Sequence, residues 1–168
     1  GYSNTQVSAF GDIAPATVKR LCDRHGLEIG GTHIGWPRLR DDLPAVIEEH
    51  ELWDCRHAAV GMIPPDTYLS LEGLDRFLGE LEPVAAAFSA AGMTFSYHIH
   101  AHEFVHFDGR PWLCHLLERS APSGLGMELD THWIVAGGGD PVSWIERCGD
   151  RMPLLHLKDF ALGPAFKR

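Results

Sequence analysis

Histidine and carboxylate residues gather in the second half of the sequence in an alternating pattern. The chain has 11 histidines among 168 residues, and several lie in the run from His98 to Glu103. Successive side chains of a β-strand point to opposite faces, so a strand ending here directs His98 and His100 to one face. Imidazole nitrogens and carboxylate oxygens together suit Mn²⁺, Zn²⁺, Fe²⁺ or Co²⁺. The run therefore predicts a site for a divalent metal ion.

Two later segments alternate in the same way. Glu128 and Asp130 are interleaved with Met127 and Leu129, and the segment 154–159 places His156 and Lys158 opposite two leucines. A polar strand face costs free energy unless its groups find partners. A barrel provides such a face, because its inner side ends at an open mouth where enzymes of this shape hold their catalytic groups. The pattern predicts one shared site built from His98, His100, Asp130 and His156.

The elements that must position these residues alternate along the whole chain. Apolar segments predict strands at 27–34, 53–62, 93–100, 124–131 and 153–160. Amphipathic or capped segments predict helices at 12–25, 43–49, 70–91, 111–119 and 141–148. Pro83 inside the long third helix predicts a kink or two abutting helices. Strict alternation without hairpins indicates parallel strands joined by right-handed crossovers.

Other polar residues have less specific explanations. His25, His50, His57 and His115 are interpreted as core or surface residues, whereas His33, at a strand end, is compatible with either role. The stretch Gly137–Gly139 lacks the spacing of a phosphate-binding loop and is predicted to be a loop before a helix.

Composition excludes several classes of function. The formal net charge of −9 disfavours binding to the phosphate backbone of nucleic acids. No apolar run reaches the roughly 18–20 residues that span a bilayer, and the first residues lack the features of a signal peptide. The 4 cysteines are scattered, which suggests reduced thiols in the cytoplasm.

At these same residues the chain resembles the sugar phosphate isomerase/epimerase family of xylose isomerase-like TIM barrels. The resemblance rests on three segments in order: Tyr97–Phe104, Glu128–Ile145 and His156–Phe160. It implies an α/β fold of the (β/α) barrel type, in which a divalent ion (Mn²⁺, Zn²⁺, Fe²⁺, Co²⁺ or Mg²⁺) is held at the strand ends. The metal ligands that it implies are Glu103, Asp130, His156 and His98, with the choice between Glu103 and His98 as first ligand left open.

The resemblance also implies roles around the metal. Glu103, His100 and Lys158 are expected to act on the substrate, and Lys158, Asp159 or Glu128 to orient the ligands. His132 stands where this branch of the family would have an aromatic residue. The expected reaction is isomerisation or epimerisation of a sugar or polyol, which begins with removal of a proton next to a carbonyl and passes through an enediolate.

Length sets the alternatives. A complete barrel of this kind has about 250 residues, so residues 1–168 are expected to form a single partial barrel domain, truncated at both ends, with about five of the eight strands. Such a sheet has unpaired edges, which predicts an oligomer or a complementing chain.

The alternatives to an isomerase or epimerase are a dehydratase of the inosose or dehydroshikimate type, an inactive fragment or binding subunit, and a DNA repair nuclease on the same fold.

Overall fold

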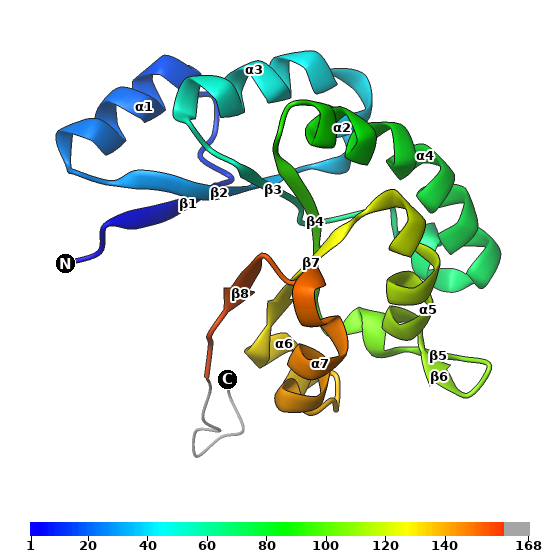
Figure 1. The fold of residues 1–168 in the computed structure, drawn as a ribbon. Coiled ribbons are helices and arrows are strands. Elements are labelled where there is room, and N and C mark those ends of the chain that lie inside the picture. The colour runs from blue at the N-terminus through cyan, green and yellow to red at the C-terminus, as the bar shows by residue number, and fades with distance from the viewer. Residues whose placement is uncertain (160–168) are drawn as a thin grey trace.

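Six parallel strands form one curled sheet in the computed structural model, which describes residues 1–159. Their order is β1-β2-β3-β4-β7-β8. The sheet bends into an open half-barrel with the helices along its outer side (Figure 1). This arrangement confirms the α/β, incomplete TIM-barrel fold class. The strands are β1 (Asn4–Ser8), β2 (Glu28–Ile34), β3 (His57–Val60), β4 (Thr94–His98), β7 (Gly126–Asp130) and β8 (Leu154–His156).

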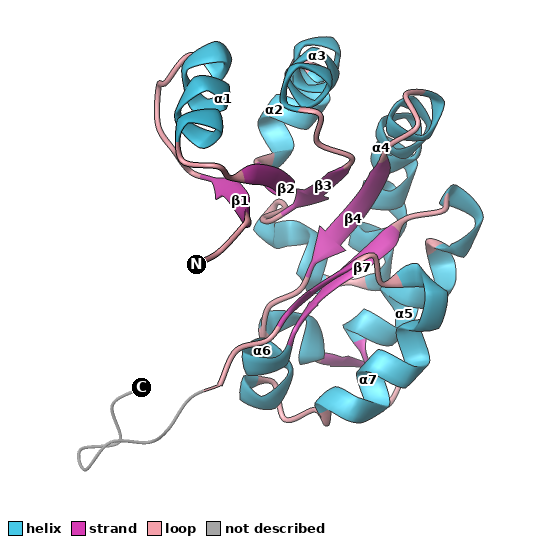
Figure 2. Ribbon diagram, turned by 60° about the vertical axis from the view of Figure 1, so that its left-hand side comes forward, coloured by secondary structure: helices cyan, strands magenta, loops and turns pink. Residues whose placement is uncertain are grey.

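The helices lie on one side of the curled sheet, which leaves its inner face uncovered (Figure 2). None of the helices within residues 1–159 combines the length and the apolar character that a membrane crossing requires. The α-helices are α1 (Pro15–Arg24), α2 (Trp36–Asp41), α3 (Leu43–Trp53), α4 (Leu71–Ala90), α5 (Trp112–Arg119), α6 (Thr131–Ala136) and α7 (Pro141–Cys148). Short 3-10 helices are η1 (Pro65–Leu69), η2 (His102–Phe104), η3 (Ala121–Ser123) and η4 (Gly149–Arg151).

The long helix α4 follows the predicted apolar stripe. Leu74, Phe77, Leu81 and Phe88 are buried at intervals of three, four and seven residues. The helix begins where the Ser70 hydroxyl accepts a hydrogen bond from the Gly73 N–H at 3.0 Å. Pro83 lies inside a single helix, so the alternative of two abutting helices is wrong. The buried stripe continues on both sides of the proline, and its packing holds the two halves together.

Strand β1 was not predicted, and six strands rather than about five are present. Its sequence, NTQVS, has only one buried apolar residue, Val7, because it forms an edge of the sheet. Its parallel pairing with β2 is irregular between Thr5 and Gln6. An edge strand that buries little apolar surface gives a weak hydrophobic signal.

The expectation of no hairpins was also wrong. Strands β5 (His106–Phe107) and β6 (Arg110–Pro111) pair antiparallel. Asp108 and Gly109 between them both have positive φ, 50° and 75°. An Asp-Gly pair between short strands is the sequence signal for this kind of turn.

The predicted division of each strand into an apolar and a polar face is confirmed. Phe95 of β4 stacks on Phe88 of α4, with ring centroids 4.9 Å apart, so it faces the helices. Met127 and Leu129 of β7 belong to the same core. His98 and Glu128 point to the inner face, where the two side chains approach each other.

The glycine stretch before α7 is needed for packing. A Cβ on Gly137 would lie 2.4 Å from a carbon of the Phe104 ring, and a Cβ on Gly139 would lie 2.5 Å from the same ring. Gly138 has a φ of +83°. These residues let α6 and the following loop approach η2 closely, consistent with a loop rather than a phosphate-binding element.

Candidate metal centre

Polar side chains from four strands converge near the carboxyl end of the sheet. The parallel register places His98 beside Glu128 and Asp130 beside His156. His33 is the penultimate residue of β2. The ligand atoms of His33, His98, Glu128 and His156 all lie within 4.8 Å of one another. We call this group the inner cluster.

One oxygen of Glu128 lies at the centre of the inner cluster. Its Oε1 accepts hydrogen bonds from His33 Nε2 at 2.7 Å and from Gln6 Nε2 at 2.8 Å. The same oxygen lies 2.8 Å from His156 Nε2 and 3.4 Å from His98 Nδ1. Gln6, from β1, also accepts a hydrogen bond from His156 Nε2 at 2.5 Å. Side chains from both edge strands, β1 and β8, therefore meet on Glu128.

Burial makes this arrangement costly without a further partner. Glu128 is fully buried, which raises the pKa of its carboxyl, but hydrogen bonds from His156 and His33 outweigh burial and hold that pKa well below its usual value. The hydrogen bond to Glu128 in turn raises the pKa of His156. Glu128 Oε2, His98 Nδ1 and His156 Nδ1 are buried and have no hydrogen-bond partner within residues 1–159.

The inner cluster therefore fits a divalent metal ion. Three imidazoles and one carboxylate form a nitrogen and oxygen donor set of the kind that binds Zn²⁺, Mn²⁺, Fe²⁺ or Co²⁺. Among the described residues, two of its imidazole nitrogens and one carboxylate oxygen have no hydrogen-bond partner, and a bound cation would fill such positions.

Asp130 lies beside the inner cluster, with other partners. Its Oδ1 accepts hydrogen bonds from the His132 and Trp133 N–H groups and so begins α6. Its Oδ2 accepts a hydrogen bond from Lys158 Nζ at 2.5 Å and lies 3.5 Å from His156 Nδ1. Burial raises the pKa of the Asp130 carboxyl. The hydrogen bond and the charge of the Lys158 ammonium lower that pKa, and the net shift is downward.

Glu103 lies in a different group of side chains, with His100 and His102. The ligand atoms of these three residues lie within 4.8 Å of one another, and we call them the outer cluster. Glu103 is fully buried. Its Oε1 accepts a hydrogen bond from the Tyr97 hydroxyl at 2.7 Å, and its Oε2 accepts one from the His100 backbone N–H at 2.8 Å.

His100 connects the two clusters. Its ring is perpendicular to that of His98 with centroids 4.8 Å apart, and parallel to that of His102 at 5.4 Å. Trp133 also lies against it, at 5.4 Å. Burial lowers the pKa of His100 to about 4, so its imidazole is neutral at pH 7.

The structure thus brings His98 and His156 together, sets Asp130 next to them and separates Glu103 from them. Gln6 was not foreseen, since nothing in its short edge strand marks it. Glu128 was expected only to orient ligands, although it shares the inner face with Asp130, and His33 lies one residue before the end of its strand. Asp159 is exposed. Phe160, which ends the third segment of the resemblance, lies outside the described residues.

Space for a small molecule opens beside the inner cluster. A cavity of about 440 Å³ lies between β1, β2 and β8, and Gln6 and His156 line it. This volume falls in the range of small-molecule sites, about 300–1,000 Å³.

Comparison with known proteins identifies the same architecture. No family model matches the sequence. The structure resembles a sugar phosphate isomerase/epimerase from Parabacteroides distasonis, with a TM-score of 0.83 and 21% identity, over 98% of this chain and 71% of that one. An AP endonuclease of family 2 from Brucella melitensis matches with a TM-score of 0.70 and 15% identity, over 92% of this chain and 68% of that one.

One curated relative matches by sequence. An inosose dehydratase from Geobacillus kaustophilus is 24% identical over 95% of this chain. The chain spans 58% of the length of that enzyme. The structural neighbours are sugar phosphate isomerase/epimerase and xylose isomerase-like TIM-barrel proteins, which confirms the resemblance at the level of the fold.

Proposed function

We propose that the protein is a metal-dependent isomerase or epimerase of an unphosphorylated sugar or polyol. The observation that carries this proposal is the convergence of three histidines and Gln6 on the buried Glu128 carboxylate near the carboxyl end of the sheet. The acidic net charge of −9 favours an uncharged substrate over a phosphorylated one.

His33, His98, Glu128 and His156 would hold the metal ion in this proposal. When bound, a divalent cation supplies Lewis-acid stabilisation of negative charge on substrate oxygens. Gln6 donates to Glu128 and accepts from His156, and so fixes the orientation of both side chains.

Proton transfer is assigned to the groups that border the inner cluster. The base takes a proton from the carbon next to the substrate carbonyl, which leaves an enediolate, and the proton is then returned to carbon. His100 lies against the ring of His98 and can donate a hydrogen bond to substrate oxygen through a ring N–H, and the Lys158 ammonium, held by Asp130, can donate a second one. Glu103 is not assigned this step, because it lies in the outer cluster.

A dehydratase would begin with the same proton removal, and the likeness to an inosose dehydratase favours this second candidate. The two differ in the next step, since a dehydratase expels a hydroxyl group as water. The product therefore separates them.

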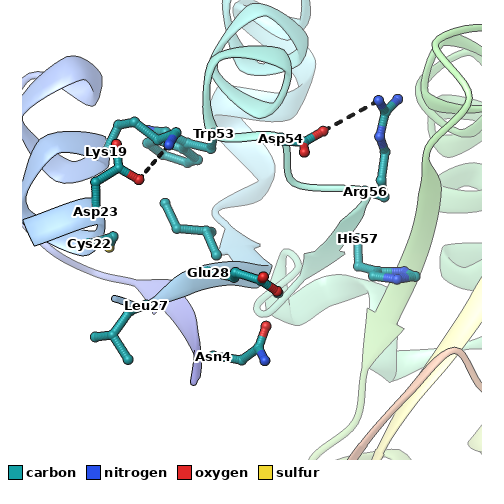
Figure 3. A pocket seen from close by; sticks show the side chains of 12 residues that line it. Asn4, Lys19, Cys22, Asp23, Leu27, Glu28, Trp53, Asp54, Arg56 and His57 are labelled. Carbon is teal, nitrogen blue, oxygen red and sulfur yellow. Dashed lines mark hydrogen bonds and ion pairs between the residues drawn. The ribbon is translucent and has the colours of Figure 1, made fainter. Parts of the chain in front are cut away.

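The test is proton exchange with solvent. The Mn²⁺-loaded protein is incubated in D₂O with a panel of free ketohexoses and keto-inositols, and NMR follows the hydrogens next to the carbonyl. We expect deuterium to appear at one of these carbons, to disappear in Glu128→Gln, and to persist in Glu28→Gln, whose side chain lies at the other end of the sheet (Figure 3). Loss of water would indicate the dehydratase. Absence of exchange across the panel in protein that has bound Mn²⁺ would support a binding subunit.

A further inference from the structure

The outer cluster has the composition of a second ligand set. His100, His102 and Glu103 offer two imidazoles and one carboxylate within 4.8 Å of one another. Metalloenzymes use two histidines and one carboxylate to hold Zn²⁺ or Fe²⁺ while leaving positions free for water or substrate. The three residues come from one short segment, the loop after β4 and the helix η2.

Charge compensation differs between the buried carboxylates. Asp130 is fully buried and is paired with the Lys158 ammonium. Glu103 is just as buried, but the ion pair it makes within residues 1–159 is with His102, at 3.2 Å. A buried carboxylate without a lasting positive partner is strongly disfavoured. A divalent cation bound between the three side chains would supply a lasting positive charge next to Glu103.

The surroundings of Glu103 fix its orientation. The Tyr97 hydroxyl donates to Oε1, and the Tyr68 hydroxyl lies 2.8 Å from that of Tyr97. The His100 N–H donates to the other oxygen. Hydrogen bonds of this kind commonly hold ligating carboxylates in place. Close contact of Gly137 with Phe104 keeps η2 against α6.

We propose that His100, His102 and Glu103 form a second divalent-cation site that adjoins the inner cluster. His102 Nε2 and Glu103 Oε1 lie 3.2 Å apart. If each were bonded to one ion at about 2.1 Å, the angle between the two bonds would be about 100°, close to tetrahedral or octahedral values. A ring nitrogen of His100 lies within 4.8 Å of a ligand atom of His102 and of Glu103, and the buried His100 Nδ1 has no hydrogen-bond partner in the described chain. His102 is 40% exposed and gives the ion a path from solvent. The contact between the rings of His98 and His100 makes the two sites neighbours.

The stoichiometry of bound Co²⁺ tests this site without any assay of activity. Equilibrium dialysis followed by elemental analysis should give two ions per chain for the protein and one for His102→Gln. His33→Gln should retain one ion, which is the outer one. Tyr97→Phe should lower the affinity for the outer ion by about 10- to 100-fold and leave the affinity for the inner ion unchanged. His106→Gln, an exposed histidine nearby, is the matched control and should bind two.

A background of Cys22→Ser removes a partly exposed thiol that could bind Co²⁺ by itself. His102→Gln is preferred to Glu103→Gln because it leaves the buried carboxylate in place, and circular dichroism checks that each variant is folded. One ion in the protein, or a stoichiometry that His102→Gln does not change, would overturn the proposal. The inner ion is counted separately from the outer one. If the protein binds the inner ion but shows no deuterium exchange, only the proposed function is disproved.

Discussion

The two ends of the curled sheet carry the same residue types in opposite environments. At the carboxyl end, Glu128, Asp130 and Glu103 are fully buried. At the amino end, a cavity of about 390 Å³ is lined by charged side chains that face solvent (Figure 3). There the side chains of Asp23 and Asp54 are 56% and 86% exposed.

Solvent explains why only one end is suited to chemistry. Lys19 bonds to Asp23 at 2.5 Å one helical turn away, and Arg56 lies 3.5 Å from Asp54, but water can satisfy all four groups. At the carboxyl end, each buried charge depends on a protein group or a bound ion. A cavity therefore does not mark the site, whereas buried polar groups with unfilled bonding positions do.

The largest expected effect compares two histidines at opposite ends. His156→Gln should weaken Mn²⁺ binding by at least about 100-fold, because it removes a ligand of the inner cluster, and even orienting partners are worth about 10- to 100-fold. His57→Gln, at the start of β3, should change the affinity less than about twofold, since His57 Nδ1 bonds to the Thr94 hydroxyl at 2.6 Å. Isothermal titration calorimetry measures both. Equal losses would contradict the separation of the two ends.

An intermediate effect is the pH dependence of stability that comes from a buried histidine with no carboxylate among its hydrogen-bond partners. His50 of α3 contacts the Thr32 hydroxyl at 2.7 Å, and burial lowers its pKa below the ordinary value of 6.5. The unfolded chain therefore takes up the proton first as the pH falls. Its contribution to stability is complete above pH 6.5 and is lost below it, by up to about 1.4 kcal/mol per pH unit until the folded-state pKa is reached.

Urea unfolding at pH 7.5 and pH 5.5 measures this loss. His50→Gln should reduce the difference in free energy of unfolding between the two conditions by about 1 kcal/mol, while the exposed His25→Gln should leave it unchanged. An unaltered difference in His50→Gln would show that other groups cause the pH dependence.

The smallest effect is expected at the amino end. Lys19→Ala removes the pair with Asp23, whose side chains are 33% and 56% exposed. Exposed pairs within a helix contribute about 0.3–0.5 kcal/mol, so the free energy of unfolding should fall by no more than about that amount. Chemical denaturation with Asp23→Asn as the companion variant measures it. A loss above about 1 kcal/mol would mean that this end also depends on its charges.

Much of the fold followed from local patterns. Periodic apolar residues located α4, and alternation along β4 and β7 assigned His98 and Glu128 to the inner face. Strand β1 and the hairpin after η2 were missed because short elements bury too little apolar surface to leave a clear pattern. The Asp108-Gly109 pair was the one signal that could have revealed the hairpin.

Sequence alone determined that His98, Glu128 and His156 lie on the polar faces of their strands, because strand periodicity decides the face to which each side chain points. Only the tertiary structure decided which of them meet. The curl of the sheet brings Gln6 to His156, 150 residues away in the chain, and directs both to Glu128. The loop after β4 turns Glu103 toward Tyr97 instead, since a buried carboxylate takes the nearest donors that the folded chain presents.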